Sequence, residues 1–183
     1  MRRKLRTIRQ NISPGIKEAY AKQLAENFKS IFPDFQHLNI GSYKATHEEI
    51  SPKFIDHFLQ KHNTLYYPIS HPFRKRGLWF GKDCGTWVKK KYQLIEPKLS
   101  LESIIAPWLL DAVIVPLVGF DHQCNRMGMG SGYYDQSFAF KQKFTTPELI
   151  GIAFDEQRLQ SITINHWDIP MDIIITPTQV FRK

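Results

Sequence analysis

The residues best suited to chemistry form one short stretch, RMGMGSGYYD, at positions 126–135. Its three glycines let a ligand approach the backbone closely, because no Cβ stands in the way. The guanidinium of Arg126 can fork onto phosphate oxygens. Asp135 offers the carboxylate that Mg²⁺ favours when it also binds substrate phosphates. The stretch therefore predicts a phosphate and metal site, with Arg126 and Asp135 as its two catalytic side chains.

The glycine spacing separates this stretch from the common phosphate-binding loops. A Walker A loop needs GxxxxGK[ST], and no lysine and hydroxyl pair of that kind occurs here. A dinucleotide fingerprint needs GxGxxG, but Gly132 comes one position early and Tyr133 stands where the third glycine belongs. A GxGxG run alone is as often a structural turn, so the neighbouring residues carry the interpretation.

Buried strands are expected on both sides of the glycine stretch. DAVIVPLV at 111–118, LIGIAF at 149–154 and DIIIT at 172–176 are continuous apolar runs, typical of strands buried on both faces. Helical patterns alternate with them, which predicts one α/β domain with a mainly parallel sheet. Ligands of open α/β sheets bind beyond the carboxyl ends of strands. The loop and a helix from about residue 132 should therefore form the site.

The N-terminal half predicts two amphipathic helices. Ser13 and Pro14 suit a helix cap and first turn, and the helix should stop before Pro33. Its apolar stripe is Ile16, Tyr20, Leu24, Phe28 and Ile31. Ser51-Pro52 repeats the cap pattern ahead of a second helix.

Four further segments have strand character. LNIGSY at 38–43 and TLYYPI at 64–69 are short and apolar, as in buried strands. GLWF at 77–80 and TWVKKKY at 86–92 are expected to pair as an added hairpin. The predicted order therefore begins with a helix and continues with strands and helices in alternation.

Length and composition limit the class of protein. The 183 residues suffice for one core of ordinary size, and 42% hydrophobic with 23% charged residues is typical of a globular domain. The two cysteines form no disulfide framework, and no HExxH motif indicates zinc. No apolar run approaches the roughly 20 residues that span a bilayer, and the N-terminus has no secretory apolar segment. We expect a cytoplasmic monomer without a membrane partner.

A net charge of +8 indicates anionic partners. It is concentrated at the N-terminus and in two runs, RKR at 74–76 and KKK at 89–91. A nucleic-acid-binding module is one alternative, but the aromatic residues lie mostly at apolar-periodic positions and no RNA-binding motif occurs. A small anionic substrate is therefore expected instead of nucleic acid.

The chain resembles a known family, the 5-formyltetrahydrofolate cyclo-ligases, also called methenyltetrahydrofolate synthetases. VPLVGFDHQCNRMGMGSGYYD at 115–135 is similar to the family pattern VPxVAFDxxGxRLGxGxGYYD. The resemblance continues in a basic N-terminal helix, in Glu96-Pro97 and in HWDIPMDIIITP at 166–177. It implies a single three-layer α/β/α domain over residues 1–183, with a mainly parallel central sheet.

The resemblance implies an ATP- and Mg²⁺-dependent ligase of one-carbon metabolism. The family converts 5-formyltetrahydrofolate to 5,10-methenyltetrahydrofolate and releases ADP and phosphate, through a phosphorylated formyl group that the folate's bridge nitrogen displaces. Phosphorylation turns a poor leaving group into a good one, so catalysis is mostly positioning and charge neutralisation. A relative with a changed substrate stays open, because the loop indicates phosphate more strongly than a pterin.

Carried over residue by residue, the resemblance assigns most of the glycine stretch to the nucleotide. The nucleotide-binding positions are Arg126, Met127, Gly128, Met129, Gly130, Ser131, Gly132, Tyr133 and Tyr134. The folate is also expected to contact part of this stretch: Met129, Gly130, Ser131, Gly132 and Tyr133. Asp135 matches the family's magnesium aspartate. Asp172 matches a second acidic position near the metal, although a solvent-facing residue before a strand explains it equally well.

A family glutamate after the first strand binds the folate. In SYKATHEEISPKFI the distance back from Ser51 favours Glu48 over Glu49, and two surface acids ahead of a helix are the alternative. A carboxylate suits the paired N–H donors of a pterin edge. Tyr43, at the end of the same strand, and Tyr92, where some members carry a stacking tryptophan, are the other expected substrate contacts.

The N-terminus departs from the family pattern, which begins with KxxxR and brings both cations to the ATP phosphates. Counting back from Ser13 places the arginine at Arg2 and the lysine off the chain. Alternatively, Lys4 and Arg6 serve from a shifted register. All three residues are therefore candidate phosphate contacts.

Overall fold

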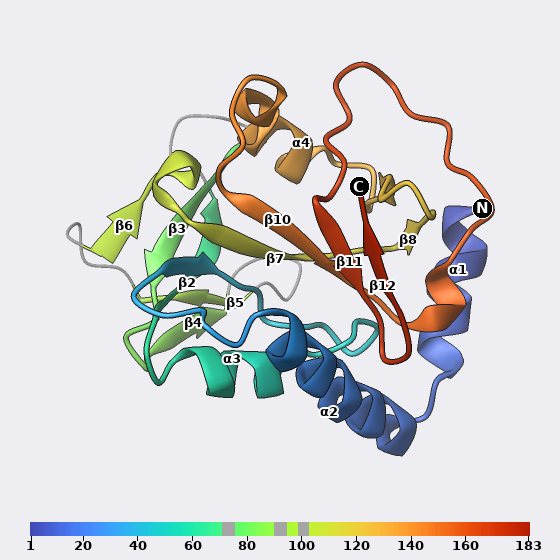
Figure 1. The fold of residues 1–183 in the computed structure, drawn as a ribbon, viewed down its shortest axis with the longest axis horizontal. Coiled ribbons are helices and arrows are strands. Elements are labelled where there is room, and N and C mark those ends of the chain that lie inside the picture. The colour runs from blue at the N-terminus through green and yellow to red at the C-terminus, as the bar shows by residue number, and fades with distance from the viewer. Residues whose placement is uncertain (71–75, 90–94, 99–102) are drawn as a thin grey trace.

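The structure is a computed structural model that describes residues 1–70, 76–89, 95–98 and 103–183. An eight-stranded sheet runs through its centre (Figure 1). In spatial order its strands are β12 (Val180–Arg182), β11 (Ile173–Ile175), β10 (Glu148–Ile152), β7 (Ala112–Pro116), β1 (Asn39–Gly41), β2 (Thr64–Ser70), β3 (Leu78–Lys82) and β6 (Ile104–Ile105). The central strands from β11 to β2 are parallel, and the outer ones are antiparallel. The predicted mainly parallel sheet is confirmed.

The three continuous apolar runs form β7, β10 and β11, as predicted. Their side chains enter two cores, because successive residues of a strand point to opposite faces. In β7, Ile114 packs in one core and its neighbours Val113 and Val115 pack in the other. Burial on both faces explains why these strands show no polar alternation.

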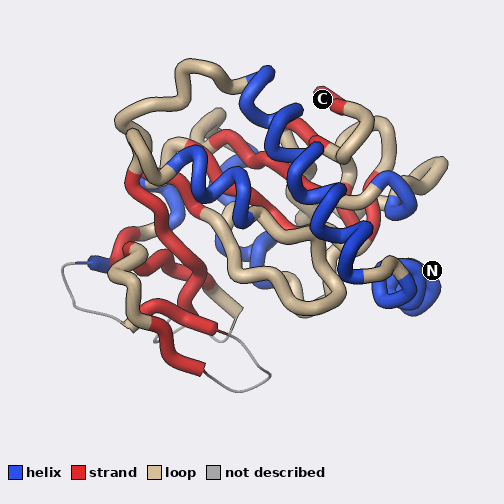
Figure 2. The backbone as a smooth tube through the Cα atoms, turned by 90° about the horizontal axis from the view of Figure 1, so that it is seen from below, coloured by secondary structure: helices blue, strands red, loops and turns tan. Residues whose placement is uncertain are grey.

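Two helices cover one face of the sheet (Figure 2). They are α2 (Pro14–Ile31) and α3 (Lys53–Leu59). The predicted cap is present, because Ser13 Oγ accepts a hydrogen bond from the Ile16 amide at 3.4 Å. Ile16 itself is 48% exposed, so the apolar stripe begins at Tyr20. The second cap was wrong by one residue: Pro52 is the N-cap of α3, although Ser51 Oγ still accepts a hydrogen bond from the Lys53 amide at 3.3 Å.

The opposite face carries a thinner layer, which lies above the sheet in Figure 1. It contains α4 (Tyr133–Ser137), the 3-10 turn η4 (Ala139–Gln142) and a small hairpin of β8 (Gly119–Phe120) and β9 (Arg126–Met127). Phe120, Cys124 and Phe138 from this layer are buried against the sheet. The three predicted layers are therefore present, with most of the helical mass on one side. None of the helices in the described ranges is long and apolar enough to cross a membrane.

The expected added hairpin was wrong. β3 pairs with β2 and β6 in the central sheet, whereas β4 (Trp87–Lys89) pairs with β5 (Ile95–Pro97). The reason is packing: Phe80 of β3 is fully buried, and its ring centroid lies 6.1 Å from that of Phe138. Residues 90–92 of the expected strand, and most of the two basic runs, lie outside the described residues.

A buried carboxylate fastens α3 to the sheet. Asp56 accepts hydrogen bonds from Ser42 Oγ at 2.6 Å and from the Tyr67 hydroxyl at 2.9 Å. Burial raises the pKa of Asp56 from 3.8 to about 6, although both donors oppose the shift. The folded state therefore holds this proton at a pH where the unfolded chain has lost it.

We predict that Asp56→Asn changes the pH dependence of stability. Because the folded pKa is raised, the wild type loses stability as pH rises from 3.8 to about 6. An asparagine cannot ionise, so the stability of the variant relative to wild type should increase over this window by about 2 kcal/mol. Urea unfolding of both proteins between acidic and neutral pH measures the difference, and parallel curves would contradict the prediction.

Candidate active site

The glycine loop follows the hairpin that extends from β7. The Val118 amide donates to the Met127 carbonyl at 2.8 Å, which folds β8 and β9 together. The predicted order of central strand, loop and helix is confirmed, but Arg126 and Met127 belong to β9 and not to the loop. α4 has only five residues, so its N-terminus supplies less dipole than a full helix would.

The glycines serve two physical needs. Gly130 has φ +97° and Gly132 has φ +71°, a backbone conformation that favours glycine. A Cβ on Gly128 would lie 3.1 Å from Arg126 Nη1, and one on Gly130 would lie 3.5 Å from the Arg2 guanidinium. The bare backbone thus leaves room beside two cations, as a phosphate cradle requires.

The arginine and the aspartate of the stretch form one ion pair. Arg126 Nη2 donates to Asp135 Oδ1, which also accepts from the Ile169 amide at 3.2 Å. The Arg126 side chain is only 6% exposed. Its Nε is buried and has no hydrogen-bond partner among the described residues. A buried, unsatisfied donor beside open glycine backbone fits a phosphate oxygen, and the adjoining carboxylate fits a divalent cation.

A second carboxylate lies under the N-terminal helix α1 (Arg2–Asn11), which Figure 1 shows beside β8. Glu48 is 6% exposed and follows β1 at the carboxyl edge of the sheet. It accepts from Arg6 Nη2 at 2.9 Å, Arg6 Nε at 3.1 Å, Gln10 Nε2 at 2.6 Å and Arg9 Nη2 at 3.1 Å. The hydrogen bonds from Arg6 are the main cause that lowers the pKa of Glu48 from 4.5 to about 2. The carboxylate is therefore anionic throughout the neutral range.

Over residues 1–177 the sequence matches the 5-formyltetrahydrofolate cyclo-ligase family. The chain belongs to this family. It is 30% identical to the 5-formyltetrahydrofolate cyclo-ligase of Haemophilus influenzae over 96% of this chain and 95% of that protein. It is 27% identical to the Escherichia coli cyclo-ligase over 97% of this chain and 99% of that protein.

Solved structures share the fold. The 5,10-methenyltetrahydrofolate synthetase of Aquifex aeolicus matches with a TM-score of 0.82 and 22% identity, covering 99% of this chain and 90% of that one. The synthetase of Mycoplasma pneumoniae matches with a TM-score of 0.75 and 21% identity, covering 96% of each chain. At these identities the likeness establishes the fold alone.

Glu48 and Glu49, the two candidates for the folate-binding glutamate, have different surroundings in the structure. Glu48 is buried in the arginine cluster, whereas Glu49 is half-buried and accepts from the Thr46 amide at 2.9 Å within its own turn. Only Glu48 is thus engaged by α1. Its contact with folate stays a prediction for this member of the cyclo-ligase family.

The three N-terminal cations have different positions. Arg2 Nε donates to the Gly128 carbonyl at 2.7 Å, so this side chain lies on the glycine loop. Arg6 contacts Glu48, and Lys4 is exposed. Residues four apart share a helix face, which explains why Arg2 and Arg6 point to the site and Lys4 does not. Arg9 was not among the predicted site residues, although its spacing from Arg2 and Arg6 continues the same helix face.

Asp172 makes its own contacts ahead of β11. Its Oδ2 accepts from Lys141 Nζ at 2.7 Å and from the Leu149 amide at 2.8 Å. Within the described part of the chain, no group of three or more His, Cys, Asp or Glu side chains is arranged to hold a metal ion. A magnesium ion at Asp135 would therefore depend on substrate phosphates for most of its ligands, and a role for Asp172 stays a prediction.

Three of the four predicted tyrosines lie within the described residues, and their surroundings differ. Tyr43 is buried, and its hydroxyl donates to the Ile50 carbonyl at 2.5 Å, so it supports the loop that carries Glu48. Tyr133 is 37% exposed and directly follows the glycine loop as the first residue of α4. Tyr134 stacks on Phe138 with an interplanar angle of 16°, and burial raises the pKa of its hydroxyl. Tyr92 lies outside the described residues.

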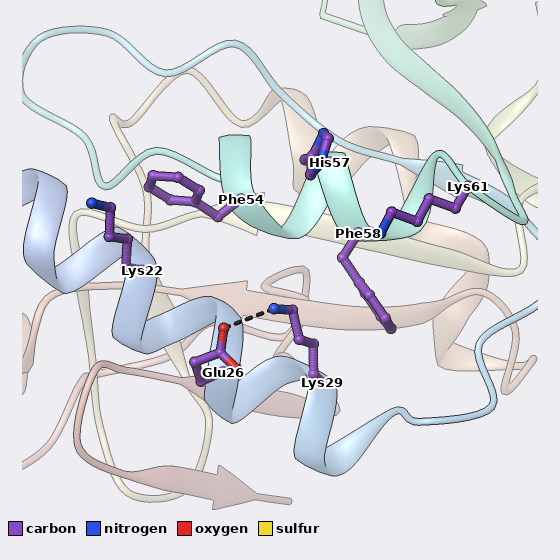
Figure 3. Close-up of a pocket in the computed structure, with 7 residues that line it drawn as sticks. All are labelled: Lys22, Glu26, Lys29, Phe54, His57, Phe58 and Lys61. Atoms are coloured by element: carbon purple, nitrogen blue, oxygen red, sulfur yellow. Dashed lines mark hydrogen bonds and ion pairs between the residues drawn. The ribbon is translucent and has the colours of Figure 1, made fainter.

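A pocket between α2 and α3 lies away from these residues (Figure 3). Two of its lysines contact other lining residues: Lys29 pairs with Glu26 at 2.7 Å, and Lys22 Nζ lies 5.7 Å from the centroid of the Phe54 ring. The pocket shares no lining residue with the predicted site. The glycine loop and Glu48 therefore remain the best candidate for the active site.

We predict opposite effects for two glycine-to-alanine changes. Gly130→Ala places a Cβ at φ +97° beside Arg2, and should cost about 1–2 kcal/mol of stability and weaken MgATP binding. Gly15→Ala, in the first turn of α2 with no atom within 4 Å, should gain about 0.5 kcal/mol and leave MgATP binding unchanged. Thermal unfolding and calorimetric titration measure both. Equal changes in stability and in MgATP binding for the two variants would contradict the requirement for glycine at position 130.

Proposed function

We propose that the protein converts 5-formyltetrahydrofolate to 5,10-methenyltetrahydrofolate, driven by ATP with Mg²⁺ and with release of ADP and phosphate. The single observation that carries the proposal is the partly buried Arg126–Asp135 pair beside the glycine loop. A guanidinium donor without a partner among the described residues, glycine backbone without side chains and a carboxylate lie together there. Membership of the cyclo-ligase family supports the choice of substrate.

The nucleotide would be held by the loop and two arginines. Arg2 already lies on the Gly128 carbonyl, and Arg126 Nε is a buried donor without a partner in the described residues. Together they neutralise phosphate charge, which is the main demand of phosphoryl transfer. ATP supplies the phosphoryl group that converts the formyl oxygen into a leaving group, and Mg²⁺ on Asp135 adds positive charge at the transferring phosphate.

The folate would be held on the side of Glu48. A carboxylate with a pKa of about 2 stays ionised and accepts the paired N–H donors of a pterin edge. Tyr133, which is 37% exposed at the start of α4, offers a flat apolar face to the pterin ring. The folate's bridge nitrogen would then displace phosphate, closing the five-membered ring.

The experiment that tests the proposed chemistry follows the formyl oxygen. With isotopically labelled formyl oxygen, the bond from carbon to that oxygen breaks at ring closure, so the label should appear in the released phosphate. Label found in water instead would contradict the phosphorylated intermediate. Asp135→Ala, assayed with and without added Mg²⁺, should lower phosphate release to the level of the metal-free wild type.

A further inference from the structure

Arg9 is a buried cation that joins three parts of the chain. Its side chain is 2% exposed. Nη2 donates to Glu48 Oε2 at 3.1 Å, and Nη1 donates to the Leu117 carbonyl at 3.1 Å. Glu48 follows β1 and Leu117 follows β7, and these two strands are parallel neighbours. Arg9 therefore fastens α1 to the loop after β1 and to the end of β7, at the edge of the sheet where the site lies.

All hydrogen-bond acceptor positions of the Glu48 carboxylate are occupied. A carboxylate offers about four acceptor positions, and four donors from α1 occupy them. A pterin can therefore bond to Glu48 only where one of these donors leaves. The geometry conflicts with a simple picture in which the folate meets an open carboxylate.

The donors differ in how easily they can leave. The Arg6 side chain is 41% exposed and Gln10 is exposed, so water can satisfy both when they turn away. Arg9 is enclosed, and turning it away from Glu48 would leave a buried charge without its counter-ion. Exchange with a ligand is therefore favoured at Arg6 and Gln10 and disfavoured at Arg9.

We propose that Arg9 is a positioning residue that holds the Glu48 carboxylate for the folate, while Arg6 and Gln10 give up their hydrogen bonds to the pterin N–H groups. The proposal rests on the proposed function. It assigns opposite roles to residues of one helix: Arg9 supports folate binding and Gln10 competes with it. A merely structural cluster would give both residues effects of the same sign.

The test measures the Kd of 5-formyltetrahydrofolate by calorimetry for three variants. Arg9→Met should weaken folate binding about tenfold, because the carboxylate loses its fixed orientation. Gln10→Ala should tighten binding about threefold, because one competing hydrogen bond is gone. Arg3→Met, an exposed arginine on the same helix, is the control and should match the wild type. MgATP affinity should change little in any of the three.

Two results would overturn the proposal: weaker folate binding by Gln10→Ala, or unchanged folate binding by an Arg9→Met protein that melts cooperatively. If Arg9→Met does not fold, the folate Kd values of Arg9→Lys and Gln10→Ala are compared with that of the wild type instead. The proposed function can fail while this proposal is still tested. If the wild type binds the folate but does not convert it, the Kd values of the variants can still be compared. A wild type that does not bind the folate contradicts both.

Discussion

Replacing Arg126 by methionine is expected to give a folded protein whose turnover of 5-formyltetrahydrofolate falls about 10³-fold. The side chain is nearly enclosed, yet Asp135 is 20% exposed and keeps its bond to the Ile169 amide, so the fold should survive. What is lost is the forked donor that faces the glycine loop. Since phosphoryl transfer depends on charge neutralisation, the loss should fall on kcat more than on KM.

Steady-state kinetics of Arg126→Met and Arg126→Lys measure this effect. The lysine keeps the charge but not the planar fork, so its kcat should lie between those of methionine and wild type. Arg158→Met is a matched control. Arg158 is exposed and its guanidinium lies 5.0 Å from the Phe181 ring centroid, with no contact to the glycine loop among the described residues. If the control lost as much activity as Arg126→Met, the assigned role would be wrong.

Glu48→Gln is expected to cost about 3 kcal/mol of stability at neutral pH. Glutamine removes the counter-ion of Arg9, whose side chain is buried, and a buried charge without its partner is strongly destabilising. The lowered pKa of Glu48 gives the effect a pH dependence. Its contribution is fully present above the ordinary value of 4.5 and is lost as pH falls toward about 2.

Urea unfolding of wild type and Glu48→Gln across this acidic range tests the prediction. The two free energies of unfolding should differ most near neutral pH and converge as pH approaches 2. Glu49→Gln is the matched control, because its glutamine oxygen can still accept from the Thr46 amide. A Glu48→Gln protein as stable as the control would show that the arginine cluster does not hold α1 in place.

Much of the fold could be predicted, because strong patterns lie within single segments. Burial on both faces produces the unbroken apolar runs of β7, β10 and β11, and the cap at Ser13 is a local interaction. β3 was assigned to the wrong partner, because its place in the sheet depends on Phe80 meeting Phe138 far along the chain. A pattern of residues within one segment cannot predict such a long-range contact.

The same division holds for the site. Arg126, Asp135 and the glycines lie in one short stretch, so their residue types indicated phosphate chemistry directly. That Arg126 and Asp135 pair with each other depends on the hairpin and α4, which the sequence did not predict in detail. Arg9 was missed because its partner Glu48 lies 39 residues away, and a basic helix by itself indicates only charge.

The most direct test of the proposed function is to mix the purified protein with 5-formyltetrahydrofolate and MgATP and to follow the near-ultraviolet absorbance of the methenyl product. We predict a rise in absorbance that requires ATP and Mg²⁺ together and that is lost in Asp135→Ala. No rise, from wild-type protein that is folded and binds both MgATP and the folate, would contradict the proposed reaction.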